Sequence, residues 1–498
     1  MNAMAELSVI CGSGGVVKQS HAVNTLRPRG WSAARGLRAD SSSTTHGTTT
    51  HGGTRSSVRL VQTRGFNRQG INAAAALGGD VVAAIEELHA ELPFSREMWS
   101  TFMKVYWQKK PLVIRGAIRA GSSVAIEADE LAGLACEAEF SPRIIRKGEG
   151  SAADWALELG PFSEEELQGL PSNGTWSLLL NDLEKHVPEA AELLDLFDHF
   201  PRWRVADVQA SISTNGGSVG AHSDQFDVFL IQADGSKRWS ISDSIEYTPD
   251  CAASFFEDID VRVLRDFRPQ LCSVLEPGDA LYLPPKVAHH GVAERCDTVC
   301  TTYSVGFLAP PHDDLVLSWA QARVDGRDDT GRWSDPWLEP QGDVGRISSG
   351  AVTQAADVIR RSMPKNEADV ARWFGCHVTA SYGFDIVGMA PENRLSAEDV
   401  LSRWREEGFL LRRADVKFAF VQGVSDGSLE GCLLFAGGNT WLLNSQQGIE
   451  LACHIANHDE IEAVDWVGWI NDTDYEINSE SKKLVSDLYN AGFIVFPL

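Results

Sequence analysis

The sequence predicts a protein of mixed architecture (α+β), in which an antiparallel jelly-roll barrel is flanked by helices. Three observations support this fold class. Residues 205–308 contain short apolar segments at regular spacing, separated by turn signals such as Asp234–Gly235. Segments with helical periodicity precede and follow this region. The 498-residue chain is 43% hydrophobic, ample for a buried core, and it lacks a run of about 20 apolar residues that would predict a membrane span.

The first 75 residues are predicted to form a disordered extension. Residues 1–70 carry a net charge of +7, whereas the remaining chain carries −32. A segment that is rich in Arg and Ser and poor in acidic residues is typical of an organelle transit peptide. We therefore expect a mitochondrial or plastid protein, with a plain disordered tail on a cytoplasmic protein as the alternative. His46 and His51 lie in the low-complexity run 41–57, which would not hold metal ligands in fixed geometry.

The catalytic domain is expected over residues 90–310. Helical spacing predicts helices over 80–92 and 95–107, and KPLVIRG at 110–116 predicts a strand. A longer helical stretch is predicted near 177–199. Strands of a cupin-like barrel are then predicted at 205–214, 226–232, 237–242, 271–276, 280–283 and 298–308. The Asp234–Gly235 pair predicts a hairpin in which Lys237 pairs with Gln232.

Two further regions complete the predicted organisation. Residues 311–388 have helical patterns, and residues 389–498 alternate helices with a small β-ribbon, which predicts a winged-helix-like module. Residues 391–498 carry a net charge of −10, so this module is expected to be structural rather than to bind DNA. The nine cysteines form no Cys-x-x-Cys pair, which excludes a zinc ribbon, an iron–sulfur site and a disulfide scaffold.

The most informative pattern is a set of possible metal ligands. His222 and Asp224 are two residues apart, so in extended backbone their side chains project to one side. His289 and His290 follow the turn after a second strand, and only one of them is needed. Two histidines and one carboxylate are the facial triad of non-haem Fe(II) oxygenases. A surface hydrogen-bonded pair is the alternative for His222 and Asp224, and His312 is a weaker ligand candidate.

A keto-acid co-substrate would also need a cation for its distal carboxylate. Lys237 is the natural candidate, although a solvated hairpin lysine is the alternative and Arg238 is the next cation to consider. Ser211, on the strand that enters the site, is a candidate hydroxyl contact for the same co-substrate.

Several longer stretches resemble JmjC-type ribosomal oxygenases, and especially the bacterial type that 3-hydroxylates an arginine of large-subunit ribosomal protein sixteen. They include WQKKPLVIRGAI, TWSLLLNDLE, WRVADVQASIS, LEPGDALYLPP and TYSVGF, and the resemblance covers about residues 93–498. It implies a double-stranded β-helix (JmjC) barrel, a homodimer built through residues 311–388, and a winged-helix-like C-terminus. The family motif Pro-Pro-x-x-x-His-x-Gly fits Pro284, Pro285, His289 and Gly291, which implies that His290 is not a ligand.

The resemblance implies Fe(II) bound by His222, Asp224 and His289, with 2-oxoglutarate contacted by Lys237 and Ser211. One position departs from the closest pattern. The bacterial arginine hydroxylases have Arg where this chain has Lys237, whereas relatives that hydroxylate histidine have Lys there. Lys binds a carboxylate as a point charge and lacks the bidentate fork of Arg.

The predicted function is therefore an Fe(II)- and 2-oxoglutarate-dependent protein hydroxylase, acting most plausibly on an arginine of an organellar large-subunit ribosomal protein. A histidyl hydroxylase or a lysine demethylase of the same superfamily is the alternative enzyme. A non-catalytic cupin-like binding module is the alternative from another class. The acidic body suits a basic ribosomal protein as partner through charge complementarity.

Overall fold

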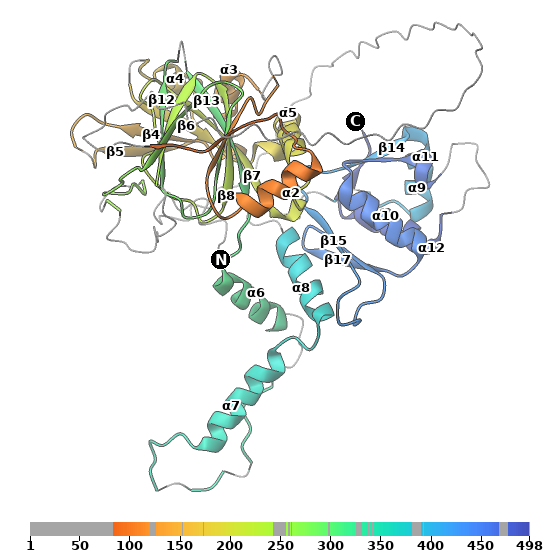
Figure 1. Ribbon diagram of the computed structural model, residues 1–498. Helices are drawn as coiled ribbons and strands as arrows, with labels where there is room; N and C mark the ends of the chain where they lie inside the picture. The colour runs from red at the N-terminus through yellow and green to blue at the C-terminus, as the bar shows by residue number, and fades with distance from the viewer. Residues whose placement is uncertain are drawn as a thin grey trace, which may run out of the picture. The chain divides into compact units, whose positions relative to one another are not determined.

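The computed structural model describes residues 83–497, except for gaps at 120–125, 152, 173, 243–254, 257–258, 260, 297–298, 325–330, 337, 341, 381–389, 392 and 468–476. The predicted extension over residues 1–75 lies outside the described residues. Figure 1 shows the order of the helices and strands along the described chain. Within the described part of the chain, no helix is both long enough and apolar enough to cross a membrane.

Two β-sheets form the framework of the N-terminal half. The larger sheet has the strand order β2-β3-β11-β8-β13-β7-β6-β4-β5, and the smaller has the order β1-β10-β9-β12. The strands are β1 (Ala83–Ala84), β2 (Glu87–His89), β3 (Leu112–Arg115), β4 (Arg143–Lys147), β5 (Trp155–Leu159), β6 (Trp176–Leu180), β7 (Val205–Ser213), β8 (Asp227–Asp234), β9 (Ser236–Ile241), β10 (Leu271–Leu275), β11 (Ala280–Leu283), β12 (His289–Glu294) and β13 (Cys300–Phe307).

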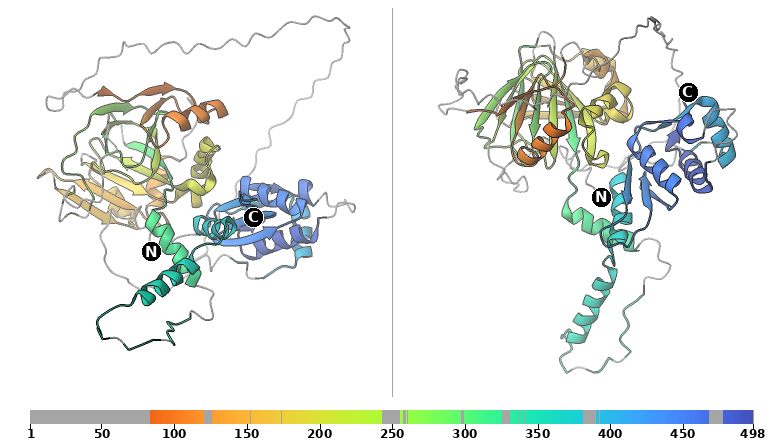
Figure 2. Two further views of the ribbon diagram at one scale, coloured as in Figure 1. Left: turned by 60° about the horizontal axis from the view of Figure 1, so that its bottom comes forward. Right: turned by 45° about the vertical axis from the view of Figure 1, so that its right-hand side comes forward.

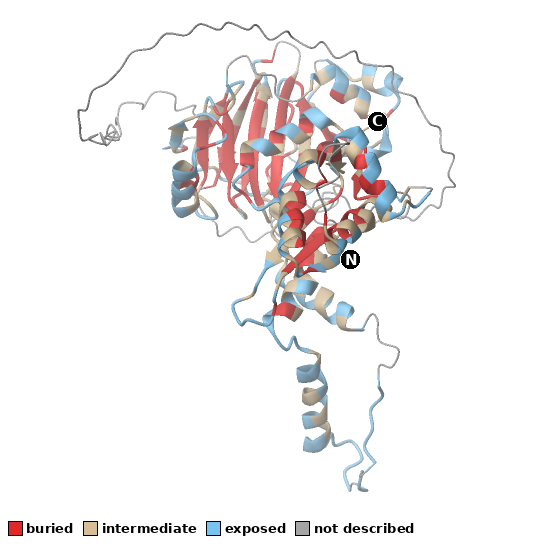
Figure 3. Cartoon of the chain, turned by 90° about the vertical axis from the view of Figure 1, so that its right-hand side faces the viewer, coloured by how far each residue is buried: buried red, intermediate tan, exposed pale blue. Residues whose placement is uncertain are grey.

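The two sheets pack against each other through apolar side chains. Val113 and Leu230 of the larger sheet share one buried cluster with Trp239 and Leu275 of the smaller sheet. Figure 3 shows that the strands are mostly buried along their length.

Helices cover the other face of the larger sheet. Helix α2 (Arg96–Val105) begins at Ser95, whose hydroxyl accepts a hydrogen bond from the Met98 N–H, and it buries Trp99 and Phe102. These rings pack with Phe229 of β8 in the largest core. The remaining helices of this half are α3 (Ala128–Leu134), η1 (Ala138–Phe140), α4 (Glu164–Gln168), η2 (Leu183–Lys185), α5 (Pro188–Ala191), η3 (Glu192–Phe197) and η4 (Arg202–Arg204).

In this half one predicted helix is wrong, and another begins later than predicted. Residues 83–89 form strands β1 and β2 rather than a helix, because Ala83 pairs with Leu271 and Glu87 pairs with Val113. Residues 176–180 form strand β6 rather than the start of a helix, since Ser177 pairs with Ser213 of β7. In both places pairing with distant strands overrides a local helical pattern.

The predicted hairpin at Asp234–Gly235 is also wrong. Strand β8 pairs with β11 and β13, whereas β9 pairs with β10 and β12, so the chain passes from one sheet to the other at Gly235. Gly235 has φ +63°, a conformation that other residues rarely adopt. Lys237 therefore pairs with Leu275 and Ala293 rather than with Gln232.

The rest of the described chain matches the predicted order of elements. The central helices are α6 (His312–Val324), α7 (Ser349–Ser362) and α8 (Glu367–Thr379). The C-terminal region has two three-stranded sheets, β18-β14-β19 and β15-β16-β17, and its own apolar core. Its elements are α9 (Ala397–Glu407), β14 (Phe409–Arg412), β15 (Phe418–Gln422), β16 (Cys432–Ala436), β17 (Asn439–Leu443), α10 (Gln446–Asn457), β18 (Glu460–Glu462), α11 (Ala463–Trp466), α12 (Ser479–Asn490) and β19 (Ile494–Val495) (Figure 2).

Candidate active site

His222 and His289 are joined through their backbones. The N–H of His222 donates to the His289 carbonyl at 2.9 Å, and the N–H of His289 donates back at 2.7 Å. The chain reaches His222 through Gly220, which has φ +85° and where a Cβ would lie 2.6 Å from Val263. His289 begins strand β12, whereas the sequence pattern placed it at the end of a strand. The bridge brings the two imidazole centroids to 4.3 Å.

Both imidazoles have the same hydrogen-bonded orientation. Nδ1 of His222 lies 3.0 Å from the Gly220 carbonyl, and Nδ1 of His289 lies 3.0 Å from the Val287 carbonyl. A carbonyl accepts only, so each Nδ1 carries a proton, and in the neutral imidazole the lone pair is then on Nε2. This arrangement is the usual outer-shell support for a histidine that binds metal through Nε2.

Asp224 completes a three-residue group with metal-ligand geometry. Its Oδ2 lies 3.7 Å from Nε2 of His289, and its carbonyl accepts a hydrogen bond from the Lys286 N–H. The ligand atoms of His222, Asp224 and His289 all lie within 4.8 Å of one another. Burial, together with the neighbouring His222, lowers the pKa of His289 to about 4, so His289 is neutral at pH 7. Two imidazoles and one carboxylate fit a divalent iron site with open positions.

A pocket adjoins this group and contains a buried lysine. Lys237 is only 6% exposed, and burial lowers its pKa. Its Nζ lies 3.4 Å from Ser211 Oγ and 3.4 Å from Thr302 Oγ1, and both residues line the pocket with it. Among the described residues, no carboxylate forms an ion pair with Lys237. A buried ammonium with two hydroxyl neighbours is therefore ready to receive an anion from the pocket.

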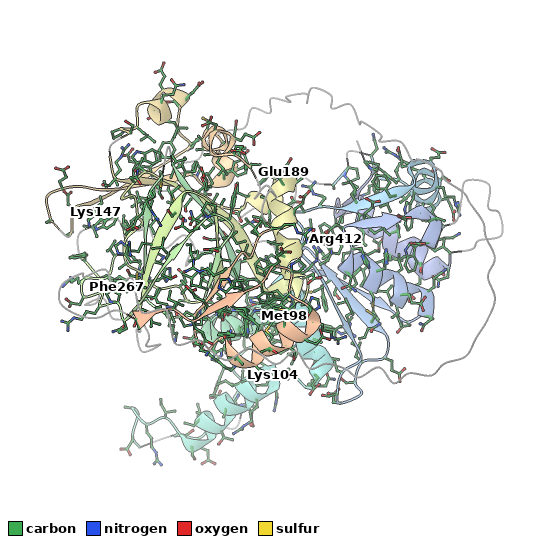
Figure 4. All side chains as sticks on the ribbon, turned by 45° about the horizontal axis from the view of Figure 1, so that its top comes forward. Met98, Lys104, Lys147, Glu189, Phe267 and Arg412 are labelled. Carbon is green, nitrogen blue, oxygen red and sulfur yellow. The ribbon has the colours of Figure 1, made fainter. Side chains whose placement is uncertain are left out.

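The alternative cation and the alternative metal ligands considered from the sequence do not belong to this site. Arg238 forms a bidentate ion pair with Glu294, at 2.6 and 2.9 Å, on the opposite face of β9. His290 is the next residue of β12 and does not line the pocket; its ring centroid lies 6.2 Å from that of Phe267, which Figure 4 labels. His312 is an exposed residue at the start of α6.

Several pocket residues were missed by the sequence analysis. Asp207 and Gln209 are on the same face of β7 as Ser211, and all three line the pocket. Thr302 pairs with Ser211 across β7 and β13. Ser211 was selected by its place on the strand that enters the site. Alternation along that strand puts residues 207 and 209 on the same face, so the signal was present in the sequence. Thr302 could be found only after the pairing of β7 with β13 was known.

Asp207 is a buried carboxylate among other charged groups. Burial raises its pKa to about 6, and Asp182 acts in the same direction. The cations that act against this shift are Lys185, Arg143 and Lys417. Asp207 is therefore ionised near pH 7, and it is 6% exposed. Among the described residues, none donates a hydrogen bond to its carboxylate, which leaves the carboxylate as an acceptor at the pocket wall.

Comparison with known proteins agrees with this geometry. Residues 192–315 match the JmjC domain. A probable ribosomal oxygenase of Haemophilus influenzae is 35% identical over 219 residues, which are 43% of this chain and half of that protein. The ribosomal protein uL16 3-hydroxylase of Escherichia coli is 31% identical over 319 residues, which are 63% of this chain and 80% of that protein.

Solved structures show the same fold. The crystal structure of E. coli YcfD has a TM-score of 0.66 with 24% identity, over 82% of this chain and all of that chain. YcfD in complex with cobalt and 2-oxoglutarate has a TM-score of 0.64, also with 24% identity, over 82% and 99% of the two chains. The predicted JmjC, cupin-like α+β fold is therefore confirmed. The chain belongs to the JmjC-domain ribosomal oxygenases, which are 2-oxoglutarate-dependent enzymes that use Fe(II).

Proposed function

We propose that this protein hydroxylates an arginine of the large-subunit ribosomal protein uL16 and that it works in an organelle. The buried ammonium of Lys237, beside the triad and without an ion-pair partner among the described residues, is the observation that carries the co-substrate assignment. His222, Asp224 and His289 are assigned as the iron ligands. When bound, iron and 2-oxoglutarate would allow oxidation by O₂, in which one oxygen atom converts a substrate C–H into C–OH and the other enters succinate as 2-oxoglutarate loses CO₂.

The protein's own residues orient the reaction. The Nδ1 hydrogen bonds fix both imidazoles, so their Nε2 atoms stay directed at one point. Lys237 holds the distal carboxylate of 2-oxoglutarate, and the hydroxyls of Ser211 and Thr302 support the same carboxylate. The buried surroundings of Lys237 strengthen this contact, because little water competes for either charge.

A buried carboxylate in the pocket favours arginine as the substrate residue. Asp207 offers an ionised acceptor, and the guanidinium of arginine is permanently charged with five N–H donors. A histidine side chain is mostly neutral at pH 7 and offers a single N–H donor. The similar E. coli protein is named as a 3-hydroxylase of ribosomal protein uL16, which supports uL16 as the substrate proposed here.

The cellular setting follows from charge and from the N-terminal extension. A body with a net charge of −32 attracts a basic ribosomal protein and is not suited to DNA. The Arg- and Ser-rich extension is proposed as a transit peptide, and organelle ribosomes provide a bacterial-type uL16. A reporter fused to residues 1–80 should enter mitochondria or plastids, whereas a diffuse cytosolic signal would contradict this assignment.

The central helices are proposed to join two copies of the chain. Helix α7 has no buried residue, and Figure 3 shows only exposed and intermediate segments along it. Val352 and Ile359 are seven residues apart and so lie on one face of it, and each is 59% exposed. An isolated 14-residue helix is marginal in water, so this apolar face needs a partner, which we assign to a second copy. The C-terminal region is proposed to be a winged-helix-like structural module.

Turnover with defined peptides tests the proposed reaction. The full chain is incubated with Fe(II), ascorbate, 2-oxoglutarate and a peptide from uL16, and succinate and peptide mass are measured together. We expect succinate to form with one oxygen added to the arginine peptide. Matched peptides with histidine or methyl-lysine in place of the arginine serve as controls. Oxygen added only to the histidine peptide, or a methyl group lost from lysine, would replace our proposal by one of the alternatives.

A further inference from the structure

The side chain of Asn181 connects buried Arg143 to Gln209 through two hydrogen bonds. The Arg143 guanidinium donates to Oδ1 of Asn181 at 3.2 Å, and the amide Nε2 of Gln209 donates to the same Oδ1 at 2.7 Å. Arg143 is 5% exposed, and both Arg143 and Gln209 line the pocket. Asn181 follows strand β6 directly and is held through its own N–H, which donates to the Phe140 carbonyl at 2.9 Å.

The donors determine which atom of each amide faces which neighbour. Arg has no acceptor, so the atom of Asn181 that it contacts must be the oxygen. An oxygen accepts only, so the atom of Gln209 that contacts it must be the NH₂ group. The remaining polar atom of the Gln209 side chain is therefore the carbonyl Oε1. Among the described residues, no donor is paired with this Oε1, and it is not sealed from solvent.

The position of Gln209 puts this acceptor beside the charged one. Asp207 and Gln209 are two residues apart on one face of β7, which separates their backbones by about 6.6 Å. The next residue on that face, Ser211, contacts Lys237. One strand thus offers two acceptors in succession and then the hydroxyl beside Lys237.

We propose that Gln209 is a specificity-determining residue that accepts a hydrogen bond from the substrate guanidinium, with Asn181 as the positioning residue that fixes its amide. This inference rests on the proposed function, because it assigns a second contact to the same substrate side chain. A planar guanidinium has donors along two edges, so it bridges two separated acceptors. An ammonium is a point charge and gains less from the second acceptor. The pair Asp207 and Gln209 therefore selects arginine over lysine.

The cation of Arg143 makes the second acceptor more important. Arg143 already acts on the charge of Asp207, so the carboxylate alone attracts an incoming cation less strongly. The carbonyl dipole of Gln209 adds attraction without adding charge. Because its NH₂ group is held by Asn181, the amide does not need to reorient when the substrate binds.

Peptide binding measures this contact without depending on turnover. Two labelled basic peptides that differ only in a central arginine or lysine are titrated with the full chain by fluorescence anisotropy. We expect wild-type protein to bind the arginine peptide more tightly. Gln209→Leu should weaken arginine-peptide binding by about tenfold or more, the effect of losing one hydrogen bond to a charged group. Lysine-peptide binding should change much less, so the dissociation constants of the two peptides should become similar.

Variants of the positioning residue separate orientation from folding. Asn181→Asp keeps an acceptor for both Arg143 and Gln209 and should retain the preference for arginine, whereas Asn181→Leu should lose it. Asn181→Leu should add no further loss in the Gln209→Leu background. Gln168→Leu, on the surface of α4, is the matched control and should leave binding unchanged. Thermal unfolding verifies that each variant folds, and Gln209→Met replaces Gln209→Leu if the latter does not.

The outcomes distinguish this inference from the proposed function. Equal loss for the two peptides in Gln209→Leu, or no loss for either, would overturn the role of Gln209. Wild-type protein that does not prefer the arginine peptide would overturn it as well. Selective binding that responds to Gln209 as predicted, but without oxygen added to the arginine, would support the contact and refute only the proposed reaction.

Discussion

Replacing Lys237 by methionine removes the cation that we assign to 2-oxoglutarate while nearly preserving side-chain volume. In the structure the Nζ of Lys237 lies 3.4 Å from each of two hydroxyls and 5.3 Å from the centroid of the Trp239 ring, and no described carboxylate forms an ion pair with it. Its charge should therefore act mainly on the bound co-substrate. A hydrogen bond to a charged group is worth about 1.5–3 kcal/mol. That range corresponds to an increase of about 10- to 150-fold in the KM for 2-oxoglutarate.

The assay is succinate production at varied 2-oxoglutarate with saturating peptide and Fe(II). Iron affinity, measured separately, should change little because Lys237 is not a proposed ligand. Arg238→Met is the matched control: Arg238 is already paired with Glu294, so its loss should leave the KM for 2-oxoglutarate near the wild-type value. An unchanged KM in Lys237→Met, or a large increase in Arg238→Met, would refute the assignment of the cation.

Two further predictions concern the metal ligands and the substrate carboxylate. His289→Ala should abolish turnover, whereas His290→Ala should keep most of it, because only His289 shares the ligand group; the opposite result in a succinate assay would mean that the wrong histidine was assigned. The KM for the arginine peptide should rise as pH falls through about 6, because protonation of Asp207 removes its charge, and it should be flat above pH 7. Asp207→Asn should have a high peptide KM that no longer depends on pH over this range, and a wild-type-like pH profile in that variant would show that another group is responsible.

The site was predictable where a short pattern fixes both residue type and geometry. His222 and Asp224 were selected by a spacing of two, and the turn before His289 and His290 indicated the third ligand, which the family motif limited to His289. Ser211 was selected by its place on the strand that enters the site, and alternation two and four residues earlier would have included Gln209 and Asp207. Neither residue belongs to a metal-ligand pattern or is a cation for the co-substrate. Their role depends on the shape of the pocket, which the sequence does not show.

The errors have a common physical cause. Residues 83–89 have a helical pattern, yet they form strands because their partners are supplied by distant segments, such as Leu271 for Ala83. The Asp234–Gly235 pair is a strong local turn signal, but the turn joins strands of different sheets. Local sequence determines that the chain turns, whereas the pairing of the strands depends on the whole fold. The bond from Gln209 to Asn181 likewise depends on the adjacency of β6 and β7.

Tandem mass spectrometry of intact uL16 is the most direct test of the central claim. Purified bacterial-type uL16 is incubated with the full chain, Fe(II), ascorbate and 2-oxoglutarate, and the His222→Ala variant serves as the matched control. We expect a single added oxygen on an arginine side chain, at its third carbon, with wild-type protein and none with the variant. Oxygen on another residue type would contradict the substrate assignment. Succinate formation without any modified residue would contradict the claim that uL16 is the substrate.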